Sequence, residues 1–209
     1  SDLDITDYSF IIMRGEDGKI RSFYNSCLHR GRTLRDEGGN VPYLRCPYHA
    51  FTWGLDGSPL FVPSRWDFDH FINGNPNLDQ TRVDTWGGFV FINMDDNCVP
   101  LETYLGVLPE HFARWPLENY VKGVHVRRTV HANWKVAQEA FQESFHVIAT
   151  HPQIMPFTGD ENSQYDTFGD NINRTITASA VTSPHIKSPP TESEVVAELL
   201  ALGGRNRNA

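Results

Sequence analysis

Two short motifs each place a cysteine within three residues of a histidine. Cys27 and His29 form C-x-H in "CLHRG", Cys46 and His49 form C-x-x-H in "CPYH", and sixteen residues (30–45) separate the motifs. Thiolate sulfur and imidazole nitrogen are ligands for zinc and for two-iron clusters. Because each motif supplies one ligand of each kind, the pattern favours a [2Fe–2S] cluster in which one iron takes both thiolates and the other both imidazoles.

Two other interpretations of these four side chains stay open at this point. A structural zinc site uses the same ligand types, although zinc fingers usually place like ligands together. Packing of cysteine and histidine in a core is the third interpretation. The remaining cysteine, Cys98, has no neighbouring histidine, and a count of three cysteines argues against a disulfide framework.

A second set of candidate ligands lies in "NWKVAQEAFQESFHVIATHP", which predicts a helix over residues 133–151 that Pro152 ends. Glu143 and His146 are three residues apart and share one face of such a helix. His151 follows five residues later, about 140° away around a regular helix. If both histidines bind one metal, the helix must bulge or end between them. An ordinary amphipathic helix with exposed histidines is the alternative.

The first half of the chain reads as β-hairpins that carry the cysteine motifs. Residues 8–25 predict a hairpin around "GEDGK", and residues 44–62 predict another around "GLDGS", because Asp-Gly pairs favour hairpin turns. Residues 86–95 predict a single strand. Residues 1–96 are therefore expected to form an all-β domain of antiparallel hairpins.

Residues 97–209 combine helical and extended patterns, which makes the whole chain α+β. Glu194 lies three residues after Thr191, the spacing of a capping box. Besides the helix at 133–151, the expected elements are a helix at 101–116, a strand at 121–136, a polar turn-rich region from about 153, a strand at 175–181 and a helix at 191–202.

Composition excludes several classes of partner. Lys and Arg number 18 against 26 Asp and Glu, giving a net charge of −8, and no dense basic stretch occurs, so nucleic acid is not expected as a partner. No apolar run reaches the length of a membrane span, and the first residues carry acids where a signal peptide carries basic and apolar ones. We therefore expect a soluble, cytoplasmic protein without membrane contact.

The residues resemble the Rieske non-haem iron oxygenases, specifically the large (α) subunits of aromatic ring-hydroxylating dioxygenases. "CLHRGRTL" and "CPYHAFTWGLDG" are similar to their two cluster-binding loops, C-x-H-R-G and then C-P-Y-H with an aromatic pair and an Asp-Gly turn. The resemblance implies that Cys27 and Cys46 bind one iron of a [2Fe–2S] cluster and that His29 and His49 bind the other. Ala50 stands where the family usually has glycine.

The segment 133–151 resembles the N-W-K…E/D-x-x-H-x-x-x-x-H motif of the same family's catalytic domain. The resemblance implies that His146 and His151 bind a mononuclear Fe(II) in a 2-His-1-carboxylate site. It also implies that Glu143, where Asp is often found, hydrogen-bonds the cluster ligand His49 of a neighbouring subunit.

The resemblance is good from residue 8 to about 152 and implies two domains, a Rieske domain at 1–96 and an incomplete, N-terminal part of the mononuclear-iron domain at 97–209. The family's third iron ligand is an Asp near the end of a much longer catalytic domain. No residue here matches it, and the acids that follow His151 are left unassigned: Asp160, Glu161, Asp166 and Asp170.

The activity implied by the resemblance is that of a terminal oxygenase in aromatic hydrocarbon catabolism. A ferredoxin or reductase supplies electrons, and O₂ is used to cis-dihydroxylate a small aromatic or other apolar molecule. Monooxygenation, including O- or N-demethylation, is the alternative reaction, and a Rieske ferredoxin that only carries electrons is the alternative protein. The implied assembly is a homotrimer, with or without a small β subunit.

Overall fold

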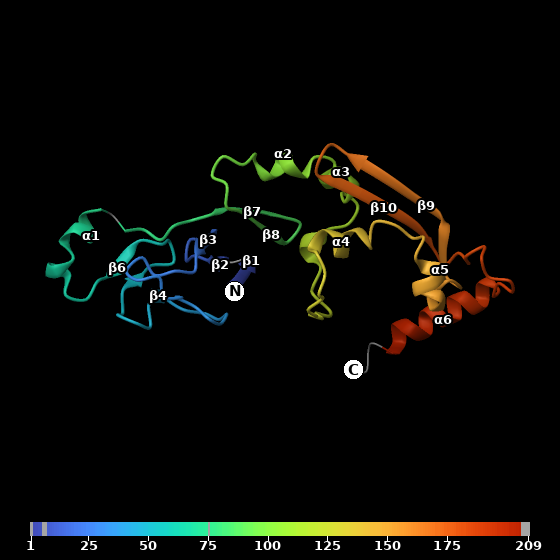
Figure 1. The fold of residues 1–209 in the computed structure, drawn as a ribbon, viewed down its shortest axis with the longest axis horizontal. Helices are drawn as coiled ribbons and strands as arrows, with labels where there is room; N and C mark the ends of the chain where they lie inside the picture. Colours follow the sequence, from blue (N-terminus) through green and yellow to red (C-terminus); the bar gives the residue numbers. More distant parts are fainter. Residues whose placement is uncertain (1, 6–7, 75, 206–209) are drawn as a thin grey trace. The chain divides into compact units, whose positions relative to one another are not determined.

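The computed structural model describes residues 2–5, 8–74 and 76–205. The chain divides into two compact units, one made of Ser1–Tyr104 with Glu110–Val121 and the other of Leu105–Pro109 with Lys122–Ala209. Figure 1 shows hairpins in the first unit and one long hairpin with helices in the second. None of the described helices has the length and apolar character needed to cross a bilayer.

The first unit begins with a three-stranded antiparallel sheet of β1 (Asp2–Ile5), β2 (Tyr8–Arg14) and β3 (Ile20–Tyr24), in that order. The expected hairpin around "GEDGK" is confirmed, with Phe10 opposite Tyr24 and Arg14 opposite Ile20. Gly18 adopts φ 77°, a left-handed conformation that glycine accepts without steric cost. The turn therefore forms where the Asp-Gly pair predicts it.

A second sheet contains β4 (Leu44–Arg45), β5 (Thr52–Trp53) and β6 (Pro59–Phe61) in sequential order. Its turn, "GLDGS", is the other expected Asp-Gly turn, and the Gly54 N–H donates to the Ser58 carbonyl at 2.8 Å. A side chain at Gly57 would place its Cβ 2.5 Å from Cε1 of Phe23, so this turn requires glycine. The contact packs the second turn closely against β3.

A buried apolar core joins these two sheets and includes both motif cysteines. Phe23, Leu44, Phe51 and Trp53 are at most 1% exposed. Burial of such large side chains is the dominant stabilising contribution of a small β domain. The buried members of the core are Ile11, Phe23, Cys27, Leu34, Leu44, Cys46, Phe51, Trp53 and Leu78.

Two expectations for residues 86–116, which lie mostly in the first unit, hold only in part, and glycine explains both. The predicted strand at 86–95 is confirmed over β8 (Phe89–Asn93). It starts later than expected because Gly87 and Gly88 turn the chain at φ 58° and 84° and pair β8 with β7 (Arg82–Trp86). The predicted helix at 101–116 is divided into α2 (Leu101–Leu105) and α3 (Leu108–His111), with Gly106 at φ 48° between them. The unit's other helical turns are η1 (Arg65–Asp67), α1 (Asp69–Asn73) and η2 (Leu117–Asn119).

The second unit is built around a long antiparallel hairpin of β9 (Thr158–Phe168) and β10 (Ile172–Ser179), which Figure 1 shows in orange. The prediction of a polar, turn-rich region from residue 153 was therefore wrong for β9. This strand exposes many of its polar side chains, so it lacks the alternating apolar pattern from which a half-buried strand is recognised. The expected strand at 175–181 is confirmed by β10.

The expected strand at 121–136 is not formed. Residues 121–130 have no strand partner in the part of the chain that the structure describes, and their valines point to solvent, with Val121 90% and Val124 76% exposed. Alternating valines predict an extended chain, but a strand also needs a neighbour for its backbone hydrogen bonds.

The helix expected near the end of the second unit is present as α6 (Glu192–Arg205). Its capping box forms as predicted. The Thr191 N–H donates to Glu194 Oε2 at 2.8 Å, and the Glu194 N–H donates to Thr191 Oγ1 at 3.4 Å.

Candidate metal centres

The two cysteine motifs form loops with the same backbone closure. The N–H of Cys27 donates to the Arg32 carbonyl at 2.8 Å, and the N–H of Gly31 returns to the Cys27 carbonyl at 2.8 Å. In the second loop the N–H of Cys46 donates to the Phe51 carbonyl at 2.9 Å, and the N–H of Ala50 returns to the Cys46 carbonyl at 3.0 Å. The two loops therefore hold each Cys and the His that follows it in a similarly closed backbone loop.

Each closure needs a left-handed residue four positions after its cysteine. Gly31 adopts φ 71° and Ala50 adopts φ 60°. The alanine noted in the sequence as a departure therefore occupies a position where a glycine is conformationally favoured.

The two thiols are buried and close together. Cys27 and Cys46 are each 2% exposed, and all three cysteines are free. Burial, together with the neighbouring Cys46, raises the pKa of the Cys27 thiol, while the backbone N–H groups of His29 and Arg30 act in the opposite direction. A buried thiol pair of this kind becomes a thiolate pair when a metal ion supplies the compensating charge.

The two imidazoles also lie close to each other, and aromatic side chains surround them. The ring centroids of His29 and His49 are 4.7 Å apart, His29 stacks on Phe51 at 4.6 Å, and Tyr48 lies 3.7 Å from His49. The Nδ1 atom of His29 is buried and has no hydrogen-bond partner. Desolvation, with the neighbouring His49, lowers the pKa of His29, which favours the neutral form that binds metal.

These side chains fit a [2Fe–2S] cluster better than a single ion. Within residues 2–5, 8–74 and 76–205, no group of three or more His, Cys, Asp or Glu residues is arranged to hold one metal ion. A tetrahedral zinc site would need four ligands converging on one point, whereas each iron of a Rieske cluster takes only two protein ligands. The unpartnered Nδ1 of His29 is the buried polar atom that such a cluster would satisfy.

The second candidate centre is not on a continuous helix, so the helix predicted over 133–151 was wrong. α4 (Trp134–Glu139) begins at Asn133, whose side chain accepts from the Lys135 N–H at 2.9 Å, and α5 (Val147–Thr150) is a separate short helix. The residues between the two helices form turns. Hydrogen bonds from the turn to β9 and β10 replace the helical ladder there.

His146 and His151 lie at the two ends of α5, immediately before and after it. Their ring centroids are 5.2 Å apart, with the ring planes at 72°. The helix ends between the two histidines, as their sharing of one metal would require, because α5 stops at Thr150 and His151 leaves helical geometry at φ −129°. A further break, which was not expected, lies between α4 and His146. The short helix brings together two rings that a regular helix would point apart.

Glu143 contacts His146 twice. Its Oε1 hydrogen-bonds the Nδ1 atom of the His146 ring, and its Oε2 accepts from the His146 backbone N–H at 3.2 Å. The bond to His146 holds the pKa of Glu143 below its usual range. Because Nδ1 is engaged by the carboxylate, Nε2 is the ring nitrogen left for a metal ion.

The four acids left unassigned after His151 are engaged elsewhere or give no sign of a ligand role. Asp166 accepts from Arg174 Nε at 2.9 Å, and Glu161 lies 3.0 Å from His185 Nε2. Asp160 is buried, with its Oδ2 3.9 Å from the same His185 nitrogen. In the described part of the chain no third His, Cys, Asp or Glu completes a metal site with the two histidines.

Three residues beside the candidate ligands were not predicted from the sequence: Phe51 stacks on His29, and Ser144 and Tyr165 hydrogen-bond to each other beside Glu143. Phe51 is within the aromatic pair that follows "CPYH", so its proximity to the motif was an available signal. Ser144 and Tyr165 are 21 residues apart, and no local pattern links them.

Comparison with known families matches two models to successive parts of the chain. Residues 1–71 match the Rieske [2Fe-2S] domain, and residues 110–207 match the ring hydroxylating alpha subunit (catalytic domain). The first family implies a [2Fe–2S] cluster, and the second implies a mononuclear iron.

Individual relatives agree with these matches. A glycine betaine monooxygenase oxygenase subunit of Pseudomonas aeruginosa is 33% identical over 73% of this chain and 36% of its own length. A solved quaternary ammonium Rieske monooxygenase, described as giving insights into carnitine oxidation and inter-subunit electron transfer, has a TM-score of 0.75 and 29% identity over 80% of this chain and 47% of its own. The 2-aminobenzenesulfonate 2,3-dioxygenase subunit alpha of Alcaligenes sp. is 28% identical over 69% of this chain and 38% of its own length. The chain thus spans less than half of each relative.

Proposed function

Since this chain belongs to the Rieske non-haem iron oxygenases, we propose that the protein it forms part of is an oxygenase component that transfers electrons from a [2Fe–2S] cluster to a mononuclear iron. Residues 1–96 are assigned to the Rieske domain and residues 97–209 to the first part of the catalytic domain. When bound, the cluster supplies single electrons and the Fe(II) supplies the site at which O₂ is activated.

The pair of matched loops around the buried thiols is the observation that carries this proposal. Cys27 and Cys46 are assigned to one iron of the cluster, and His29 and His49 to the other. The phenylalanine stacked on His29 covers one face of that ring and limits its rotation. A rigid, partly dry shell of this kind favours electron transfer because little has to move when the charge changes.

His146 and His151 are assigned to the mononuclear iron, and Glu143 is assigned to the connection between the two centres. By accepting a hydrogen bond from the Nδ1–H of His146, Glu143 fixes the tautomer that leaves Nε2 for the metal. The Glu143 side chain is 34% exposed, so it remains accessible to a second hydrogen-bond donor. We assign that donor to His49 of a neighbouring subunit and propose a homotrimer, a closed ring in which each subunit can offer both groups.

The preferred reaction is monooxygenation of a small quaternary ammonium compound. Its support is the similarity to the glycine betaine monooxygenase subunit and to the solved quaternary ammonium monooxygenase. One oxygen atom of O₂ enters the substrate and the other leaves as water, with two electrons supplied through a ferredoxin or reductase and two protons taken from solvent. A cytoplasmic location suits a protein that depends on such a donor.

Cis-dihydroxylation of an aromatic compound, the reaction expected first from the sequence, is the second candidate. The similarity to the 2-aminobenzenesulfonate dioxygenase subunit supports it at lower identity. A small β subunit would accompany the protein if it follows that type of assembly.

Two measurements on the complete protein test the proposal. Metal analysis with electron paramagnetic resonance of the dithionite-reduced protein should give a Rieske signal and additional iron; zinc without a cluster signal would refute it. Product analysis with glycine betaine, carnitine and an aromatic hydrocarbon, each with an electron donor protein and O₂, should show one atom of O₂ incorporated into the product of a quaternary ammonium substrate, either as an alcohol or, where the C–N bond then breaks, as an aldehyde released with the amine. Two oxygens gained by the aromatic compound would establish the second candidate.

A further inference from the structure

The turn that carries Glu143 and His146 is attached to the β9–β10 hairpin by hydrogen bonds. The Ser144 N–H donates to the Tyr165 hydroxyl oxygen at 3.1 Å, and the Ser144 and Tyr165 hydroxyl oxygens are 2.8 Å apart. The Gln142 carbonyl accepts from the Thr175 hydroxyl at 3.3 Å. The backbone on both sides of Glu143 is therefore fixed to the hairpin.

The network continues inward from Ser144, which is 5% exposed. Its hydroxyl oxygen lies 2.8 Å from both the Asp160 carbonyl and the Ser163 hydroxyl, and the Ser163 hydroxyl donates to the same carbonyl at 2.9 Å. Each hydroxyl has one hydrogen to donate and can accept two. In one consistent arrangement the Tyr165 hydroxyl donates to Ser144, the Ser144 hydroxyl donates to Ser163, and the Ser163 hydroxyl donates to the Asp160 carbonyl. Each of these hydroxyl hydrogens then has an acceptor.

A bulge in β9 places these acceptors. Gly159 pairs with Ala178 and Gln164 pairs with Ile176, so residues 160–163 lie opposite the single residue Thr177. The extra residues redirect the Asp160 carbonyl and the Ser163 hydroxyl toward Ser144. Bulges of this kind often occur beside functional sites because they re-aim side chains.

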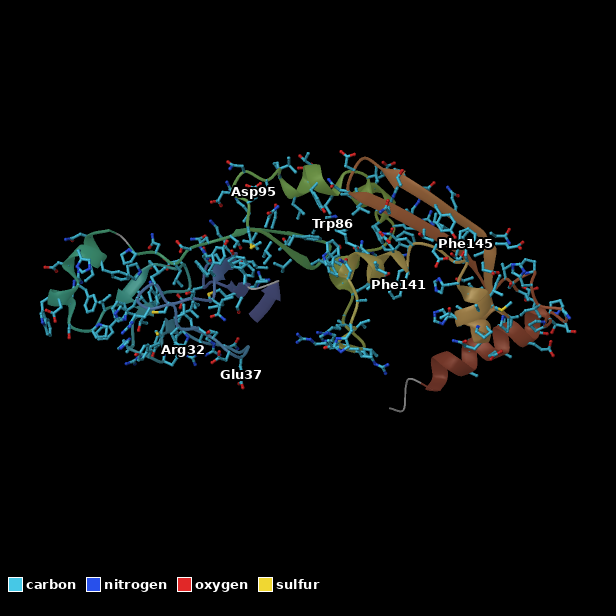
Figure 2. All side chains as sticks on the ribbon, in the orientation of Figure 1. Arg32, Glu37, Trp86, Asp95, Phe141 and Phe145 are labelled. Carbon is cyan, nitrogen blue, oxygen red and sulfur yellow. The ribbon has the colours of Figure 1, made fainter. Side chains whose placement is uncertain are left out.

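Two phenylalanines of the segment that carries Ser144 are mostly exposed. Phe145 is 78% exposed and Phe141 is 85% exposed, and both lie on the segment between α4 and α5 (Figure 2). The Phe145 ring lies against the Tyr165 ring, with the centroids 6.2 Å apart, so an aromatic contact accompanies the hydroxyl network. The hydroxyl network supplies the hydrogen bonds that join Ser144, between Glu143 and His146, to the hairpin.

We propose that Ser144 and Tyr165 are positioning residues for the mononuclear iron, because their hydroxyl network fixes the turn that orients Glu143 and His146. The inference rests on the proposed function, since it assumes that His146 binds iron. Neither residue is among the ligands assigned to the metal. Their effect is to hold a metal-binding ring and its carboxylate partner in one arrangement before the ion binds.

The test uses the complete protein and compares Tyr165→Phe with Thr167→Val, a hydroxyl removal at an exposed position of the same strand outside this network. Tyr165 is 42% exposed, so its phenyl ring can stay in place when the hydroxyl is lost. Chelator competition should show ferrous iron bound roughly 3- to 10-fold more weakly in Tyr165→Phe, the factor expected from one net hydrogen bond. Its nitric oxide complex should give a broadened paramagnetic resonance signal, with the cluster signal unchanged.

Ser144→Ala supplies the second variant, and its expected loss of iron affinity is at least as large because it removes the central hydroxyl. Iron affinity and line shape equal to those of Thr167→Val in both variants would overturn the inference. A lower melting temperature with unchanged iron affinity would also overturn it, because the network would then be only structural. If the unmodified protein binds no mononuclear iron, the proposed function fails and the inference falls with it.

Discussion

Replacing Ala50 by glycine is expected to stabilise the second cysteine loop, and replacing Gly31 by alanine is expected to destabilise the first. The two residues hold equivalent positions, each donating its N–H to the carbonyl of the cysteine four residues earlier. Both are left-handed, at φ 60° for Ala50 and 71° for Gly31. The pair therefore compares alanine and glycine in one backbone conformation.

The magnitude follows from two opposing contributions to the free energy of unfolding. A left-handed conformation costs a residue with a Cβ about 1–2 kcal/mol. Glycine costs roughly 0.4–1 kcal/mol through the greater freedom of its unfolded chain. Ala50→Gly should therefore gain roughly 0.5–1 kcal/mol, and Gly31→Ala should lose a similar amount. A Cβ at Gly31 would meet only the Ser26 hydroxyl oxygen, at 3.9 Å, so a steric clash adds nothing.

The assay is denaturant unfolding of the cluster-loaded complete protein, followed by the visible absorbance of the cluster. Ala50→Gly should move the midpoint to higher denaturant and Gly31→Ala to lower, with unchanged slopes. A destabilising Ala50→Gly would refute the reasoning, since it would mean that the loop is not strained at this position. An unchanged midpoint for Gly31→Ala would refute it as well.

Four further changes have defined outcomes. Glu143→Gln should slow electron transfer to the mononuclear iron in single-turnover measurements while the cluster signal persists; an unchanged rate would remove Glu143 from the connecting role. His146→Ala should abolish mononuclear iron and keep the cluster, so loss of both would indicate misfolding. The hydrogen bond from Arg21 lowers the pKa of Asp17. This interaction therefore stabilises the fold at pH values above the usual aspartate pKa, and the stabilisation is lost as the pH falls through the lowered pKa. Asp17→Asn should make unfolding less dependent on acid pH, and an unchanged pH profile would contradict this. Thr191→Ala should reduce hydrogen-exchange protection at the start of α6 by about 1 kcal/mol, and equal protection would show that the capping box is dispensable.

Local signals predicted the parts of the fold that depend on only a few neighbouring residues. The two Asp-Gly turns and the capping box at Thr191 formed as expected, because each is a hydrogen-bonded unit complete within five residues or fewer. The strand expected at 121–136 failed because a strand also needs a partner, which local sequence does not identify. β9 was overlooked because an exposed ladder carries no apolar alternation.

The sequence by itself determined which atoms are available for metal chemistry: two thiols and two imidazoles in paired motifs, and a Glu-x-x-His followed by a second histidine. Only the tertiary structure decided that the thiols are buried against the same core and that His29 keeps an unpartnered nitrogen. It also decided that the chain leaves the helix before His146, because the turn bonds to β9 and β10 instead of to its own backbone. Ligand type is a property of single residues, whereas burial and helix interruption depend on contacts between segments far apart in the chain.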